Sequence, residues 1–247
     1  MPRFYVPPAG CGGDSILLGP AETAHAVRVL RLGPGARVMI LNGAGGRFDC
    51  EISAVEKRAT TLRVIDSVVE PAPRPRVTLV QAVLKTKPMD WLIQKATELG
   101  VTRIVPVLTG RTVPDFSSAE SGRKREKWEA VAVEALKQCG LAWLPRIEPP
   151  QLLSGFIETG TSFHASWVGA LNVGAARLGA RLDEVLPVGA ETGELGLWLG
   201  PEGDFTASEL AAIQAVGAIP VSLGPRVLRS ETAALTMLAV LGEHFGR

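Results

Sequence analysis

The chain has 247 residues, with 26 Lys and Arg, 25 Asp and Glu, and a formal net charge of +1. Hydrophobic residues make up 46% of it, which excludes a disordered protein, and the longest apolar runs are too short to cross a membrane. Three scattered cysteines and three isolated histidines match neither a disulfide framework nor a metal site. We therefore expect a globular protein in a reducing compartment, the cytoplasm, without a secretory signal, a membrane anchor or a metal ion.

The charge is unevenly distributed along the chain. Residues 1–130 carry 19 Lys and Arg against 13 Asp and Glu, whereas residues 131–247 carry 7 against 12. A basic front half favours contact with a polyanion through that half. Uneven surface charge without any such partner explains the same counts.

Short strands are expected through the first seventy residues. The β-branched or alternating runs are RFYV, SILL, RVMILN, RFDCEISAV and TTLRVID. The turn NGAGG at residues 42–46 supplies the positive φ angles of a hairpin. One helical segment, residues 21–31, interrupts them, with Val27 and Leu30 on one face and Arg28 and Arg31 near the other. The pattern predicts a small β-barrel, which is either an RNA-binding module or a plain β module.

The proline-rich stretch Glu70 to Arg76 separates this part from the rest of the chain. Beyond it, buried-type runs alternate with helical patterns. The predicted strands are residues 76–84, 102–108, 162–167, 195–200 and 218–224, and the predicted helices are 88–100, 123–140, 206–217 and 230–245. This alternation predicts an α/β domain with a largely parallel sheet. We place the domains at residues 1–71 and 72–247.

Local patterns predict how these helices begin and what they bury. The spacing of Trp91, Leu92 and Ala96 predicts one apolar stripe. Thr206 and Glu209 have the spacing of a capping box, and Ser230 is predicted as an N-cap. Another helix opens with Arg123, Lys124, Arg125 and Lys127. Positive charge at a helix N-terminus opposes the helix dipole, so these residues either serve a partner or are solvated surface.

Two glycine-bearing turns follow late strands, LGPEGDF at residues 199–205 and LGPRVLRSETA at residues 223–233. The phosphate loop GxxxxGK[ST], the dinucleotide motif GxGxxG and the nucleophile elbow GxSxG are all absent from the sequence. Ligands bind outside the carboxyl ends of strands in such sheets, so the two turns could enclose one ligand. Glu202 and Asp204 would repel a phosphate and tolerate a neutral or cationic ligand. Two ordinary turns before capped helices are the alternative.

These segments also carry a resemblance that spans nearly the whole chain. The further matching segments are MPRFYV, HAVRVLRLGPGARVMILNGAGG, VLKTKPMDWLIQKATELGVTRIVPVLTGRTV and KREKWEAVAVEALKQCG. The chain resembles the 16S rRNA uridine-N3 methyltransferases of the SPOUT superfamily of knotted methyltransferases. The resemblance implies a PUA-like β-barrel followed by an α/β SPOUT domain with a deep trefoil knot. It further implies a homodimer that acts on 16S rRNA of the small ribosomal subunit.

The resemblance implies S-adenosylmethionine as the cofactor, bound in a bent shape by the knot loops. The residues implied for cofactor binding are Thr109, Leu199, Gly200, Pro201, Glu202, Gly203, Leu223, Gly224, Val227, Leu228 and Arg229. Uridine N3 must lose its proton before or during attack on the methyl carbon. We expect Arg229 to stabilise the anionic base and Glu231 to accept the proton or orient a water. An ion pair at the helix start is the alternative for both.

The N3 atom lies on the Watson–Crick edge, so the target base must be unpaired or pulled from its stack. The residues expected to grip the RNA are Arg28, Arg31, Arg123, Lys124, Arg125 and Lys127. Two positions depart from the family: Asp204 replaces the last glycine of GPEGG, and Leu141 stands where many relatives carry arginine. The departure at Leu141 leaves an RNA-binding protein with impaired catalysis as one alternative. A small-molecule α/β enzyme unrelated to RNA is a separate alternative, against which the N-terminal barrel argues.

Overall fold

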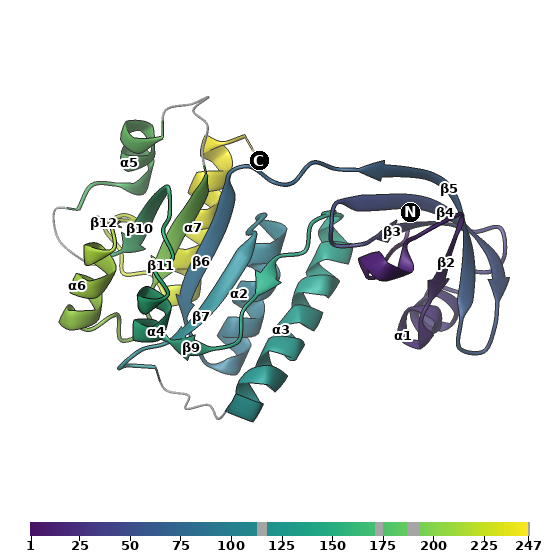
Figure 1. Cartoon of the computed structure of the whole chain (residues 1–247), viewed down its shortest axis with the longest axis horizontal. Coiled ribbons are helices and arrows are strands. Elements are labelled where there is room, and N and C mark those ends of the chain that lie inside the picture. The colour runs from purple at the N-terminus through teal and green to yellow at the C-terminus, as the bar shows by residue number, and fades with distance from the viewer. Residues whose placement is uncertain (113–117, 171–174, 187–192, 247) are drawn as a thin grey trace. The chain divides into compact units, whose positions relative to one another are not determined.

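A computed structural model describes residues 1–112, 118–170, 175–186 and 193–246 (Figure 1). The chain divides into two compact units, the first made of Met1–Ala72 and Val133–Leu144, the second of Pro73–Ala132 and Pro145–Arg247. Among the described residues, no helix is both long and apolar enough to span a membrane. In the same ranges, no group of His, Cys, Asp and Glu side chains could hold a metal ion.

The segment 133–144 groups with the first unit, although the sequence predicts it inside the second domain. Arg3 donates a 2.7 Å hydrogen bond to the carbonyl oxygen of Gln138. The buried ammonium of Lys137 lies 2.9 Å from the carboxylate of Glu22. These bonds join residues more than 100 positions apart in the chain, so local sequence patterns do not reveal them.

A five-stranded sheet in the order β1-β3-β4-β5-β2 forms the first unit. Its strands are β1 (Arg3–Tyr5), β2 (Ser15–Leu18), β3 (Arg37–Leu41), β4 (Gly46–Val55) and β5 (Thr60–Val69). β1 pairs parallel with β3, and the other pairs are antiparallel. Alternate side chains such as Val38, Ile40 and Leu62 are fully buried on one side. β1 and β2 stand at the two ends of this order, so closure into a barrel stays a prediction.

The helical segment of the first unit is less regular than the sequence predicts. α1 (Pro20–Ala24) continues directly into a π-helical turn at His25–Val29. The wider turn rotates the residues that follow, and Leu30, predicted on the apolar face, is 39% exposed. Arg31 then adopts a left-handed backbone conformation with φ of 54°.

The second unit contains a sheet in the order β12-β10-β11-β6-β7-β8, with β9 also paired to β7. Its strands are β6 (Arg76–Ala82), β7 (Arg103–Leu108), β8 (Arg146–Ile147), β9 (Gln151–Leu152), β10 (Ala165–Gly169), β11 (Glu194–Leu199) and β12 (Ala218–Val221). Every pairing in this sheet is parallel. The prediction of an α/β domain with a largely parallel sheet is therefore confirmed.

Helices cover both faces of this sheet (Figure 1). The helices that follow β6 in the chain are α2 (Thr86–Glu98), α3 (Ser118–Cys139), α4 (Leu153–Glu158), α5 (Leu178–Val185), α6 (Ala207–Ala215) and α7 (Ser230–His244), and the last part of α3 belongs to the first unit. α2 and α7 contact each other, as do α4 and α6. The apolar stripe of α2 differs from the predicted one: Trp91 is 44% exposed, whereas Met89, Leu92, Ile93 and Ala96 are buried.

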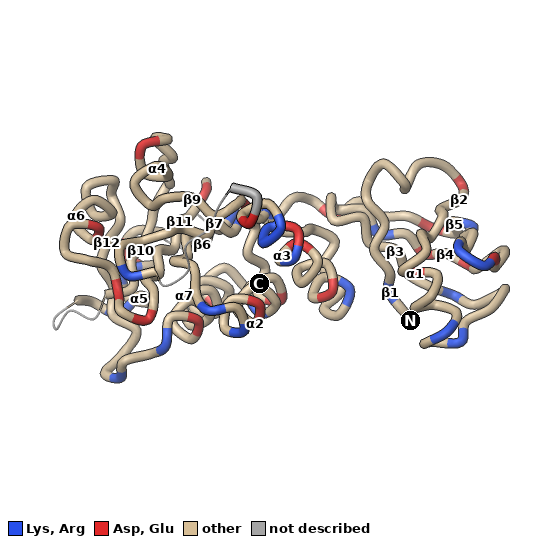
Figure 2. Tube along the Cα trace, turned by 90° about the horizontal axis from the view of Figure 1, so that it is seen from below, with Lys and Arg blue, Asp and Glu red and all other residues tan. Residues whose placement is uncertain are grey.

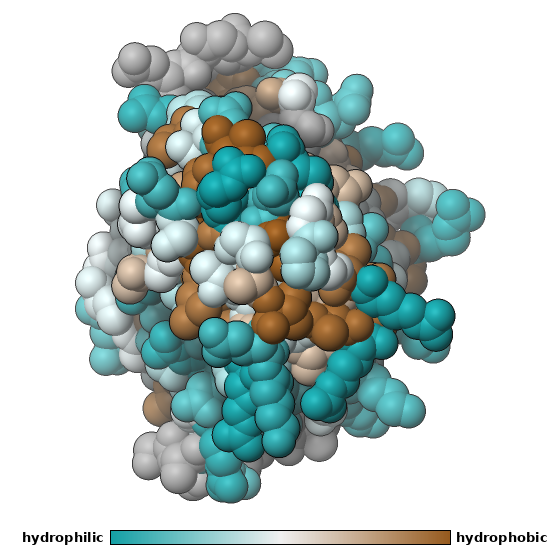
Figure 3. All heavy atoms as spheres, turned by 90° about the vertical axis from the view of Figure 1, so that its right-hand side faces the viewer, coloured by the Kyte–Doolittle hydropathy of each residue, from teal (hydrophilic) through white to brown (hydrophobic). Residues whose placement is uncertain are grey.

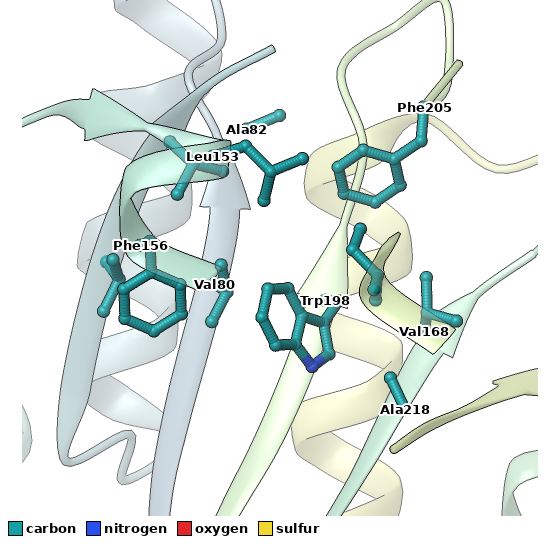
Figure 4. Packing of buried hydrophobic residues seen from close by; sticks show 11 residues of the cluster. Val80, Ala82, Leu153, Phe156, Val168, Trp198, Phe205 and Ala218 are labelled. Carbon is teal, nitrogen blue, oxygen red and sulfur yellow. The ribbon is translucent and has the colours of Figure 1, made fainter. Parts of the chain in front are cut away.

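The core beside α4 and α6 is centred on Trp198 of β11 (Figure 4). The Trp198 ring lies 5.7 Å from the ring of Phe156 and 5.9 Å from that of Phe163. Val80 of β6 and Val168 of β10 complete the same layer. This packing fixes the carboxyl end of β11, the end from which the LGPEGDF turn starts.

Candidate active site

A cavity of about 700 Å³ lies at the carboxyl ends of β10, β11 and β12. The two predicted turns line it together, as expected if they enclose one ligand. The lining residues are Gly169, Ala170, Ala175, Arg177, Leu199, Gly200, Pro201, Glu202, Asp204, Ser222, Leu223, Gly224, Pro225, Arg226, Val227, Leu228, Arg229, Ser230 and Ala233. A volume of about 300–1,000 Å³ is usual for sites that hold a small ligand or cofactor.

The LGPEGDF turn is tightly folded on itself. Asp204 has φ of 61°, the left-handed conformation that the sequence allows for an aspartate at this position. The Asp204 carboxylate accepts a 2.7 Å hydrogen bond from the Phe205 N–H, and its own N–H donates to the Pro201 carbonyl at 2.9 Å. A Cβ atom on Gly200 would lie 2.9 Å from the Phe205 nitrogen, so this position admits only glycine without rearrangement.

The capping box of α6 also binds the turn after β7. Glu209 accepts hydrogen bonds from the Thr206 N–H at 2.8 Å, the Thr206 hydroxyl at 2.9 Å and the Gly110 N–H at 2.7 Å. Arg111 donates to the Gly203 carbonyl at 2.6 Å. Burial alone would raise the pKa of Glu209, but these hydrogen bonds and the Arg111 charge outweigh it and lower that pKa. The predicted capping box is confirmed. Glu209 also binds the turn after β7 through the Gly110 N–H, which the sequence does not reveal.

Ser230 joins the two turns instead of capping α7. It is the first residue of the helix, and Arg229 occupies the N-cap position without a capping bond from its side chain. The Ser230 hydroxyl donates to the Gly200 carbonyl at 2.5 Å and accepts from the buried amide of Gln81 at 2.9 Å. The predicted N-cap is therefore wrong, because the hydroxyl is already engaged by these partners. The sequence-based predictions did not include Gln81. A lone glutamine within the apolar run RVTLVQAVL could have indicated a buried polar contact.

The turn after β12 is more open. The N–H of Ser222 donates to Ala176 at 3.0 Å, and that of Gly224 donates to the Ser222 hydroxyl at 3.2 Å. In the parts of the chain that the structure describes, the backbone N–H groups of Leu223, Val227 and Leu228 have no hydrogen-bond partner. These donors stand beside apolar side chains, a combination typical of sites for small ligands and cofactors.

Nine of the eleven residues predicted to bind the cofactor line the cavity. The other two are Thr109 and Gly203. The Thr109 N–H donates to the Thr112 hydroxyl at 2.9 Å, and Gly203 meets Arg111. Asp204 and Arg226, which belong to the two predicted turns but were not among the eleven, also line the cavity, and so does Arg177 from outside both turns.

The two predicted catalytic residues lie on either side of the start of α7. Arg229 is exposed and lines the cavity. Glu231 is half-buried in the first turn of the helix and is not among the lining residues. Among the described residues, neither side chain forms an ion pair or a hydrogen bond, so the alternative of an ion pair at the helix start is not found.

The predicted RNA-binding cluster Arg123, Lys124, Arg125 and Lys127 lies inside α3, which begins at Ser118. The predicted helix start is therefore wrong, and these charges do not face the unfavourable end of the helix dipole. Arg125 pairs with Glu129 at 2.8 Å, and Lys127 pairs with Asp90. Figure 2 shows basic and acidic residues interleaved near the start of α3, which reduces the net charge of this helix.

The predicted RNA-binding residues of the first unit are both exposed. Arg28 and Arg31 flank Val29 and Leu30, which are 68% and 39% exposed. Figure 3 shows one face of the molecule on which apolar side chains reach the surface among hydrophilic ones. Leu141, where many relatives carry arginine, is half-buried in the turn after α3.

A parallel sheet with a cavity at its carboxyl edge, together with a small β unit, defines a two-unit α/β protein with a site for a small ligand. Residues 70–242 match the family model of an RNA methyltransferase domain, and residues 18–65 match an RNA methyltransferase PUA domain. The chain therefore belongs to this family of RNA methyltransferases.

Similar proteins agree with this assignment over almost the whole chain. Ribosomal RNA small subunit methyltransferase E of Mycobacterium tuberculosis is 30% identical, over 97% of this chain and 90% of that protein. The protein of the same name from Synechocystis is 32% identical, over 96% of this chain and 76% of that protein.

Two solved structures share the fold and contain the same small molecule. A methyltransferase from Legionella pneumophila in complex with the cofactor SAM has a TM-score of 0.86 and 29% identity, covering 98% of this chain and 96% of that one. A ribosomal RNA small subunit methyltransferase E from Neisseria gonorrhoeae, bound to S-adenosyl methionine, also has a TM-score of 0.86. It is 26% identical and covers 99% of this chain and 98% of that one.

Proposed function

We propose that this protein uses S-adenosylmethionine to methylate N3 of one uridine of 16S rRNA in the small ribosomal subunit. The observation that carries the proposal is the single cavity formed by the LGPEGDF and LGPRVLRSETA turns in a chain of the RNA methyltransferase family. The names of the relatives and the SAM held by the two solved structures support the substrate and the cofactor.

The lining residues fit this cofactor in three respects. The apolar side chains of Leu199, Leu223 and Leu228 suit the faces of a purine. The N–H groups of Leu223 and Val227, which have no partner among the described residues, suit the acceptor nitrogens and oxygens at a ligand's edge. The exposed carboxylate of Glu202 suits the positive charge of a sulfonium.

The bound cofactor supplies an electrophilic methyl group. Arg229 holds a guanidinium at the cavity, where it donates hydrogen bonds to the uracil oxygen that becomes negative as N3 loses its proton. Glu231 accepts that proton. Its side chain is not among the residues that line the cavity, so a bridging water carries the proton to it. The N–C bond then forms as the carbon–sulfur bond breaks, and sulfur leaves as a neutral thioether.

The proposal includes the finer features that the resemblance implies. These are a trefoil knot of the SPOUT type, a PUA-like β-barrel, a homodimer, domains at residues 1–71 and 72–247, and a cytoplasmic location, where small subunits are assembled. Arg28 and Arg31 would hold RNA backbone from the first unit. In α3, Arg123 has no partner among the described residues, and it is the member of its cluster best placed to bind RNA.

Transfer of a labelled methyl group to small subunits that lack the modification tests this function. We expect one methylated nucleotide, which mass spectrometry of 16S rRNA fragments identifies as an N3-methylated uridine. Transfer to another base, or to another atom of uracil, would contradict the proposal. Binding of the cofactor in calorimetry without any transfer would instead support an RNA-binding protein with impaired catalysis.

A further inference from the structure

Several arginines around the cavity have no side-chain partner in the part of the chain that the structure describes. Among the described residues of the second unit, five arginines have neither an ion pair nor a side-chain hydrogen bond: Arg74, Arg123, Arg177, Arg226 and Arg229. Three of the five, namely Arg177, Arg226 and Arg229, line the cavity. The other described arginines of this unit are all engaged: Arg76, Arg103, Arg111, Arg125, Arg146 and Arg181.

Backbone hydrogen bonds bring two of these arginines to one side of the cavity. Ser222 donates its N–H to Ala176 at 3.0 Å and accepts from the Leu178 N–H at 3.3 Å. Arg177 lies between these two bonds and forms a parallel bridge with Ser222. The segment before α5 is thereby fixed to the turn that carries Arg226.

The charges of the cavity are divided between its two sides. Glu202 and Asp204 lie on the turn after β11, whereas Arg177 and Arg226 lie on the turn after β12 and the segment bound to it. The Asp204 carboxylate is already engaged by the Phe205 N–H. The acidic side suits a sulfonium, and the basic side suits an anion held at the same time.

An RNA phosphate fits the basic side better than a carboxylate within the cavity. A flipped base enters a pocket while its sugar and phosphates stay at the surface. Arg177 and Arg226 are both exposed, so their free donors are available there. A planar guanidinium group binds phosphate oxygens with two parallel hydrogen bonds. Two guanidinium groups offer more donors than one carboxylate needs for such bidentate binding.

We propose that Arg177 and Arg226 form a subsite for an RNA phosphate next to the target uridine. This inference rests on the proposed function, because it assigns part of the substrate to the same cavity. The methionine carboxylate of the cofactor shares the anionic chemistry and is the alternative occupant.

The test uses the full-length protein and small ribosomal subunits that lack the methyl group. For Arg177→Gln and Arg226→Gln we expect KM for subunits to rise roughly fivefold to tenfold while kcat stays within twofold. The slope of log affinity against log salt concentration should fall by about 0.7–0.9 for each variant. The cofactor Kd from calorimetry should change by less than twofold.

Arg74→Gln and Arg181→Gln are matched controls, because neither arginine lines the cavity and Arg74 is also unpaired. A weaker cofactor Kd with an unchanged salt slope would assign both arginines to the carboxylate and overturn the subsite. Unchanged KM and salt slope would overturn it as well. Methyl transfer by the wild-type protein tests the proposed function separately, since only the differences between variants test the subsite.

Discussion

The two turns that line the cavity differ in how firmly they are held. The turn after β11 is bonded to itself at Asp204, to α7 through Ser230 and to the turn after β7 through Arg111. The turn after β12 is fixed near Ser222, whereas Pro225, Arg226, Val227 and Arg229 are exposed. We infer that the first turn is a preformed wall and that the second carries the groups that meet the substrate.

This difference predicts that variants of the open turn change the reaction and leave stability intact. Arg229→Ala should lower kcat by about 100-fold to 1,000-fold, because it removes a donor to the developing anion. The melting temperature should stay within about 1 °C, since Arg229 is exposed and has no side-chain partner among the described residues. Single-turnover transfer to small subunits and a thermal melt measure the two quantities.

Glu231→Gln separates proton acceptance from a purely structural role. A loss of kcat that is relieved at higher pH would support proton acceptance. Turnover at the wild-type rate for either variant would remove that residue from the mechanism.

Variants of the turn after β11 should instead lower the stability of the fold. Gly200→Ala places a Cβ atom 2.9 Å from the Phe205 nitrogen, and the backbone must move to relieve the contact. We expect a loss of about 3 kcal/mol in unfolding free energy and at least tenfold weaker cofactor binding. In Gly203→Ala the new Cβ atom meets only the Arg111 side chain, at 3.3 Å, so this control should remain stable. Equal stability of both variants would show that the first turn is not rigid.

Ser230→Ala tests the bond between the two turns. The substitution removes the hydrogen-bond partner of the Gly200 carbonyl and of one N–H of the Gln81 amide in a buried site, while the Gln81 amide keeps its bond to the Ala82 carbonyl. Denaturant unfolding should show a loss of about 2 kcal/mol. Val227→Ala is the control, because it truncates a side chain that is 78% exposed. It should leave the free energy of unfolding unchanged. A neutral Ser230→Ala would mean that the two turns are held independently.

Glu209→Gln should lower stability less than Gly200→Ala or Ser230→Ala and should do so in a pH-dependent way. The folded state lowers the pKa of Glu209 below its usual value of 4.5, so the ionised carboxylate stabilises the fold above that value. This stabilisation is lost as pH falls through the lowered folded-state pKa. The variant should therefore melt about 2–4 °C lower than the wild-type protein at pH 7. This difference in melting temperature should disappear below pH 4.5. A difference independent of pH would contradict the ionic role.

The sequence predicted the parallel sheet and the two cavity turns because their signals are local. Glycines and prolines mark the turns, and buried strands show as continuous apolar runs. The bonds that hold the site together are not local. Gln81 meets Ser230 across 149 positions, and Glu209 meets Gly110 across 99, so neither pairing leaves a pattern in a short window.

Two wrong predictions have the same kind of cause. Ser230 has the residue type of an N-cap, but tertiary partners engage its hydroxyl. Trp91 fits the helical period of the apolar face, yet Met89 and Ile93 fill that face and leave it 44% exposed. In both cases the packing of distant segments outweighs a preference that is correct for an isolated helix.

A crystal structure of the protein with S-adenosylmethionine would show whether the two turns hold the cofactor between them. We expect cofactor density in the cavity, in contact with both the Leu199–Glu202 turn and the Leu223–Arg229 turn, with the first turn unmoved. Density outside this cavity, or a first turn that refolds to admit the cofactor, would contradict this expectation.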